Sequence, residues 1–160
     1  MPAKYKQDIA GLPCGVSAEH SGCECAHTAT VKTGEEIRFG SIVAFDLADS
    51  TNSVDVARLP IAGDAATGLV FGVARRQEGG EYDETDTIKE NCVFEVLHDG
   101  RYTVETIDSA VNRGDVFVNV TPGPDQGKVS SAAGEIIPGA KFIGERATPG
   151  VATIYIPKFG

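Results

Sequence analysis

Cysteine and histidine side chains gather near the start of the chain, within fourteen residues. Thiolate and imidazole groups are ligands that zinc prefers, and four of them can surround the ion tetrahedrally. The spacing differs from a common zinc turn, because the two closest cysteines are separated by a single residue. The same cysteines can instead form disulfides after release into an oxidising medium, or pack as small apolar groups. All three interpretations stay open for Cys14, His20, Cys23, Cys25 and His27.

A second group of potential metal ligands lies in residues 78–86, where five of nine side chains are acidic. Carboxylate oxygens can bind calcium, but this segment lacks the ordered Asp-x-Asp-x-Asp-Gly of a helix–loop–helix calcium site. We therefore expect a solvated loop between two strands. Calcium binding, or a charged contact to a partner protein, are the alternatives.

The side chains that catalysis needs are not assembled in a recognisable motif. There is no Gly-x-Ser-x-Gly elbow, and the glycine-rich residues 123–128 are one residue short of a phosphate loop and contain a proline. His98 precedes a turn sequence and is expected to be exposed, and Cys92 opens an expected strand and should lie in the core. We predict that the protein is not an enzyme and binds no cofactor or metal. A small β-barrel enzyme, such as a nucleotide hydrolase, is the alternative from another class.

The chain of 160 residues is long enough for one domain with a buried core. Its 14 Lys and Arg against 23 Asp and Glu give a net charge of −9. An acidic protein of this kind is poorly suited to neutralising the phosphates of nucleic acid or to docking on an anionic membrane. The sequence has no apolar run long enough to cross a bilayer and no secretory signal at residues 1–13, so we expect synthesis in the cytoplasm.

Short apolar runs separated by Gly, Pro and Asp predict an all-β protein. Several runs alternate, so that Tyr102, Val104 and Thr106 would share one face of a strand. The dipeptide Asp99-Gly100, between two such runs, is typical of a tight hairpin turn. About ten short strands at this spacing favour a single β-barrel or a jelly-roll-like β-sandwich. We expect strands at 36–39, 41–45, 54–59, 69–75, 92–97, 101–106, 115–120, 127–130, 140–145 and 151–156.

The order of these motifs along most of the chain resembles the small decoration, or cement, proteins of tailed-bacteriophage capsids. The similar motifs are Ile-Arg-Phe-Gly-Ser-Ile-Val at 37–43, Phe-Gly-Val-Ala at 71–74, Val-Asn-Arg-Gly-Asp-Val-Phe-Val at 111–118 and Gly-Val-Ala-Thr-Ile-Tyr-Ile at 150–156. The resemblance implies a β-barrel or β-sandwich that self-associates and binds the outer face of an assembled shell. It implies no catalysis.

Residues 1–34 have no sustained periodicity, and we interpret them as an irregular docking arm that precedes a β domain at 35–160. The partners expected are the major capsid protein and further copies of the chain, as a dimer or trimer, with no direct contact to nucleic acid or membrane. The protein would be made in the host cytoplasm and reside on the outer capsid surface. Arm residues expected to contact the shell, unless they pack on their own domain, are Tyr5, Ile9, Leu12, Pro13 and Val16.

Two further alternatives place the chain in other binding proteins. One is another part of the virion, such as a tail or fibre-base module. The other is a carbohydrate-binding β-sandwich, which would need exposed aromatic side chains. The chain contains only seven Phe and four Tyr, and most of them lie in the expected strands.

Overall fold

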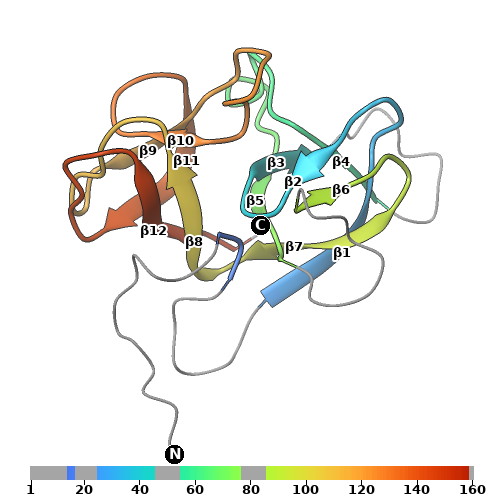
Figure 1. Ribbon diagram of the computed structural model, residues 1–160, viewed down its shortest axis with the longest axis horizontal. Coiled ribbons are helices and arrows are strands. Elements are labelled where there is room, and N and C mark those ends of the chain that lie inside the picture. Colours follow the sequence, from blue (N-terminus) through green and yellow to red (C-terminus); the bar gives the residue numbers. More distant parts are fainter. Residues whose placement is uncertain (1–13, 17–24, 46–54, 77–85, 159–160) are drawn as a thin grey trace, which may run out of the picture.

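The prediction of an all-β protein is confirmed by a computed structural model, which describes residues 14–16, 25–45, 55–76 and 86–158. Twelve strands and no helix occur within these ranges, so no helix that could cross a membrane is found there either (Figure 1). The strands are β1 (Cys25–Val31), β2 (Ile37–Arg38), β3 (Ile42–Phe45), β4 (Asp55–Arg58), β5 (Phe71–Ala74), β6 (Thr87–Ile88), β7 (Val93–His98), β8 (Gly100–Thr106), β9 (Asp115–Val118), β10 (Val129–Ser130), β11 (Glu135–Ile143) and β12 (Gly150–Ile156).

The strands divide between two small closed barrels, a division that the sequence did not suggest. The first barrel has the order β1-β4-β3-β5-β7, and the second has the order β10-β8-β12-β11-β9. Figure 1 shows the two barrels side by side. A two-stranded ribbon of β2 and β6 buries Ile37 and Ile88 against the core of the first barrel. Because closure pairs every strand of a barrel on both sides, neither barrel offers a free hydrogen-bonding edge.

Strand β1 changes the expected boundary between arm and domain. Ala29 and Val31 alternate with more exposed neighbours and are at most 1% exposed, so they contribute to the interior of the first barrel. β1 pairs in parallel with β4 and antiparallel with β7. Cys25–Val31 therefore belongs to the folded domain and not to an arm that extends to residue 34. The sequence did not predict this strand because its apolar alternation is confined to two side chains.

The shared buried face expected for Tyr102, Val104 and Thr106 is confirmed, although Thr103 on the opposite face is buried as well. Tyr102, Val104 and Thr106 of β8 are buried, and so are Val116 and Val118 of β9. Each of the valines among them contributes roughly 1.5–3 kcal/mol when fully removed from water. The inward faces of β8, β9 and β12 thus explain why these segments form strands of one barrel.

The expected hairpin at Asp99-Gly100 is wrong. β7 pairs with β1 and β5 of the first barrel, whereas β8 pairs with β10 and β12 of the second. The chain crosses between the barrels here, with Asp99 at a positive φ of 51° and the Tyr102 hydroxyl donating to the His98 carbonyl at 2.6 Å. His98 is consequently buried rather than exposed.

One apolar cluster spans both barrels. It joins Ile42, Phe71 and Leu97 of the first barrel to Tyr102 and Ile154 of the second. Since all five side chains are at most 5% exposed, the seam between the barrels is packed like a domain interior. We therefore treat the two barrels as one structural unit.

Candidate functional site

Residues 14–16 lie across the seam between the two barrels. The Gly15 amide donates to the Thr103 carbonyl of β8 at 2.8 Å, while the Arg76 amide, just after β5, donates to the Gly15 carbonyl at 2.9 Å. Val16 and Thr103 exchange a second set of bonds, with the Thr103 amide donating to the Val16 carbonyl at 3.0 Å and the Val16 amide donating to Thr103 Oγ1 at 3.1 Å. This short segment links the first barrel to the second by backbone hydrogen bonds.

Residues 14–16 pack so closely against the first barrel that positions 15 and 40 must be glycine. Gly15 has a φ of +80°, and a Cβ at this position would lie 2.7 Å from the Ala74 carbonyl oxygen. Gly40 has a φ of +81°, and its Cβ would lie 2.2 Å from the Cβ of Cys14. Any side chain at either position would therefore push residues 14–16 out of the seam.

The arm residues chosen from the sequence are only partly placed. Val16 is half-buried, and its backbone is hydrogen-bonded to Thr103. Tyr5, Ile9, Leu12 and Pro13 lie outside the described residues. The structure thus defines where residues 1–13 join the domain, which is the seam.

The candidate zinc ligands that the structure describes have other partners. His27 Nε2 lies 2.6 Å from Asp55 Oδ2, and Cys25 Sγ lies 3.9 Å from Asp99 Oδ2. Among the described residues, no three His, Cys, Asp or Glu side chains are arranged to hold a metal ion. His20 and Cys23 lie outside the described residues, as do residues 78–85 of the acidic stretch.

The Cys14 thiol sits in an environment that disfavours the thiolate. Burial, and secondly the charge of Glu105, raise the pKa of Cys14 to about 11. Its carbonyl accepts a hydrogen bond from Arg76 Nε at 3.1 Å. Since zinc binds the thiolate, this cysteine is a poor ligand at neutral pH. Cys14, Cys25 and Cys92 are free thiols, and Cys92 is exposed, against expectation, because it precedes β7 in a loop.

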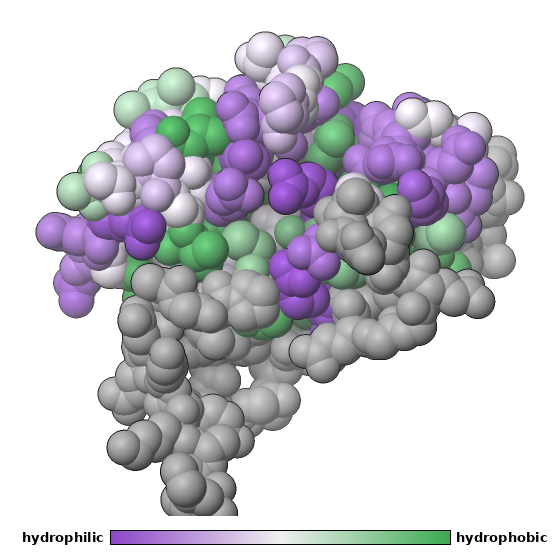
Figure 2. All heavy atoms as spheres, in the orientation of Figure 1, coloured by the Kyte–Doolittle hydropathy of each residue, from purple (hydrophilic) through white to green (hydrophobic). Residues whose placement is uncertain are grey.

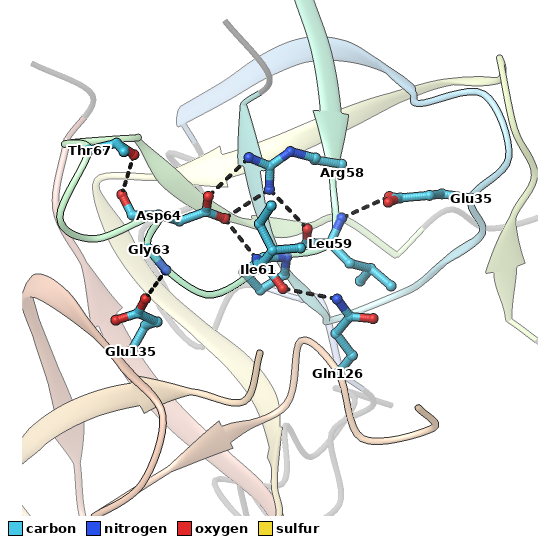
Figure 3. A network of polar contacts seen from close by, with 10 residues as sticks. Glu35, Arg58, Leu59, Ile61, Gly63, Asp64, Thr67, Gln126 and Glu135 are labelled. Carbon is cyan, nitrogen blue, oxygen red and sulfur yellow. Dashed lines mark hydrogen bonds and ion pairs between the residues drawn. The ribbon is translucent and has the colours of Figure 1, made fainter. Parts of the chain in front are cut away.

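A buried polar network fixes the loop that follows β4 (Figure 3). Arg58 and Asp64 form a bidentate ion pair, with Nη1–Oδ2 and Nη2–Oδ1 distances of 2.8 and 3.0 Å. Both residues are less than 9% exposed. The Ile61 amide also donates to Asp64 Oδ2, at 2.8 Å. Because the two buried charges are paired, each offsets the loss of water around the other. The pair also holds the loop in one conformation.

The same loop reaches across to the second barrel. Gln126 Nε2 donates to the Pro60 carbonyl at 3.0 Å, and the Gly63 amide donates to the Glu135 carboxylate (Figure 3). Sequence reasoning missed this connection, because residues near 60 and residues near 130 are neighbours only after both barrels have formed. The individual Asp and Arg residues carried no local signal.

A pocket of about 210 Å³ opens along the seam, beside residues 14–16. Its lining comes from β2 and the following turn, from Leu59, from Thr87 of β6 and Glu105 of β8, and from the connection between β9 and β10. Lys128 forms part of the pocket wall, and its Nζ lies 3.2 Å from Glu105 Oε1 and 2.9 Å from Asp125 Oδ1. Both carboxylates raise the pKa of Lys128, the hydrogen bond to Asp125 most strongly, so Lys128 is a cation.

Large apolar side chains are exposed at only a few described positions. Ile61 and Ile136, 45% and 41% exposed, are each close in sequence to one partner of the Gly63–Glu135 hydrogen bond. Val93 and Val111 are exposed elsewhere. On the face shown in Figure 2, hydrophilic residues gather over the first barrel, at the upper right, while hydrophobic residues emerge between polar ones over the second. In the part of the chain that the structure describes, the features of this site are contacts between the barrels and exposed surface.

A sequence profile for the family described as "Structural cement protein (E217 gp24/Pam3 gp6)", a phage cement family, matches residues 3–156. The chain belongs to this phage structural cement protein family. Cement proteins are structural components of the virion, and this chain accordingly has a capsid cement role. The family match confirms the resemblance seen in the order of the sequence motifs.

A solved structure supports the fold of this cement-family chain. A chain in "The capsid of Myoviridae Phage XM1" superposes with a TM-score of 0.69, at 19% sequence identity, over 96% of this chain and 95% of that chain. No curated protein sequence gives a significant match. The shared fold therefore extends over both barrels and the seam between them.

Proposed function

We propose that the protein binds the outer surface of the assembled major capsid shell and stabilises it by bridging shell subunits. The observation that carries this proposal is the cement-family match over residues 3–156. A ligand that binds assembled subunits, and not dispersed ones, shifts the equilibrium toward assembly. Neither this role nor the site geometry needs catalysis, so the proposed function is not enzymatic.

The rigidity of the two-barrel unit suits a bridge between subunits. In the described part of the chain, the apolar cluster holds the two barrels together, and the Arg58–Asp64 network fixes the loop after β4. A pre-organised binding surface loses less conformational entropy when it docks. A rigid bridge also resists separation of the subunits that it connects.

We propose that residues 1–13 act as the docking arm, with Tyr5, Ile9, Leu12 and Pro13 as contacts to the shell. This arm is shorter than the 1–34 segment expected from the sequence, because β1 belongs to the first barrel. The backbone hydrogen bonds that hold residues 14–16 at the seam support this proposal, because these residues directly follow the arm.

Self-association as a dimer or trimer is proposed for the avidity that several copies gain on equivalent sites. Pairing of open sheet edges does not contribute to this proposal, because both barrels are closed. Residence on the outer capsid surface, after synthesis in the host cytoplasm, agrees with the net charge of −9, which disfavours contact with packaged DNA.

Shells assembled from the major capsid protein alone provide the test. Purified full-length protein should sediment with these shells and raise the temperature at which they dissociate. A variant lacking residues 2–13 but retaining Cys14 should fold, as judged by circular dichroism, and lose most shell binding. Undiminished binding by this truncated variant would refute the arm, and absence of binding by the full-length protein would refute the proposed function.

A further inference from the structure

The pocket on the seam has dimensions and a lining that suit a peptide side chain. Its volume of about 210 Å³ is below the roughly 300–1,000 Å³ of sites that hold drug-sized ligands or cofactors. Phe39, Leu59 and Pro124 supply apolar surface, and the ribbon strand β2 forms one wall. A pocket of this size accommodates one or two side chains.

The charged side chains at the pocket differ in whether they form ion pairs. Lys128 Nζ forms ion pairs with both Glu105 and Asp125, and Lys89 Nζ lies 3.5 Å from Glu36 Oε1. Arg38 also lines the pocket and is exposed, and no acidic side chain in the described ranges forms an ion pair with it. The pocket therefore presents a guanidinium without an ion pair of its own beside an apolar surface. A guanidinium of this kind binds carboxylates through paired hydrogen bonds.

We propose that this pocket binds a segment of the shell protein that presents an apolar side chain next to a carboxylate. Arg38 pairs with the carboxylate, while Phe39 and Leu59 receive the apolar side chain. The identity of the partner rests on the proposed function; the chemistry of the ligand rests on the pocket itself. The pocket lies beside the root of the arm, because Gly40 in its lining touches Cys14.

The ligand chemistry can be tested without any shell. N-acetyl-leucine carries an isobutyl side chain and a carboxylate, and N-acetyl-leucinamide is the same molecule without the charge. In ¹H–¹⁵N spectra of the full-length protein, N-acetyl-leucine should shift the amide signals of Gly40 and Gln126 with millimolar affinity. The amide analogue should bind about tenfold more weakly. Equal shifts by both compounds, or no shift by either, would overturn the proposal.

A pair of charge reversals tests the cation. Arg38→Glu should lower affinity for N-acetyl-leucine and for capsid shells by about tenfold or more, and Arg38→Lys should restore part of both. Arg113→Glu is the matched control, because Arg113 is also exposed but lies in the turn before β9, outside the pocket. This control should bind both within about twofold of wild type.

Two outcomes separate the pocket from the proposed function. If wild-type protein binds shells and Arg38→Glu binds them equally well, the pocket's role is overturned and the proposed function stands. If wild-type protein fails to bind shells, the proposed function is overturned, whatever the small-molecule result. A melting temperature for free Arg38→Glu several degrees below that of Arg113→Glu would show that Arg38 is already neutralised within the chain, and would also overturn the proposal.

Discussion

The Gly15 amide donates to the Thr103 carbonyl at 2.8 Å, joining the N-terminal segment to a strand of the second barrel. The Gly15→Ala variant should lower the free energy of unfolding by about 2–5 kcal/mol, since it adds left-handed backbone strain to a clash with the Ala74 carbonyl. Gly34→Ala is the matched control: Gly34 has a φ of +87°, but its Cβ would meet nothing within 4 Å. Urea unfolding of both variants measures the difference, and equal losses would contradict the close packing at the seam.

The buried ion pair gives a second prediction. Asp64→Ala leaves the Arg58 guanidinium buried without its partner, so we expect a loss of about 3–5 kcal/mol in unfolding free energy. Asp115→Ala removes a comparable pair with Lys141, but these side chains are about half exposed, and the cost should stay below about 1 kcal/mol. A small effect at Asp64, measured by the same denaturant titration, would mean that the network in Figure 3 does not hold the loop.

The buried imidazole of His98 makes stability depend on pH. Burial lowers the pKa of His98 below its ordinary value of 6.5, and His27 and Lys158 lower it further against the opposing charge of Asp99. The unfolded chain therefore takes up a proton at a higher pH than the folded chain does. Stability should be fully present above about pH 7 and should fall as the pH drops through 6.5 toward the folded pKa.

Thermal unfolding at several pH values between 5 and about 8 tests this dependence. His98→Gln should flatten the curve in that window, although the variant is expected to be less stable at every pH because it disturbs a buried position. A curve with the same slope in wild type and His98→Gln would rule out this histidine as the source.

The cysteines should differ in reactivity. Burial raises the pKa of Cys14 to about 11, whereas Cys92 is exposed. Because the thiolate is the reactive form, iodoacetamide at about pH 8 should modify Cys92 first and leave Cys14 largely intact. Peptide mass spectrometry reads out each site, and both cysteines should react in denaturant. Rapid modification of Cys14 in the folded protein would contradict its position in the seam.

The sequence predicted the strands well where alternation is local. β8 shows this clearly, because Tyr102, Val104 and Thr106 alternate with polar residues and all three face the core. β1 was missed, since only Ala29 and Val31 are buried among residues that looked like metal ligands. The two-residue strand β6 is too short to produce a periodic signal.

The seam could not be predicted, because the contacts that define it join distant parts of the chain. Asp99-Gly100 has the local chemistry of a hairpin, and only the pairing of its flanking strands with other partners turns it into a crossing. The local sequence around Gly15 likewise gives no sign that a glycine is required there. The requirement arises from its positive φ and from the Ala74 and Gly40 backbones, which approach it only in the assembled fold.

The crossing at Asp99 also divides the chain by order of synthesis. Every strand of the first barrel precedes this residue, and every strand of the second follows it. A ribosome therefore releases the first barrel while Ile42, Phe71 and Leu97 still lack the neighbours that will cover them. Until β8 and β12 emerge, these side chains form an exposed apolar surface on the nascent chain. The time between synthesis of the first barrel and synthesis of the second is thus the stage at which translation speed or a chaperone affects whether the chain folds or aggregates.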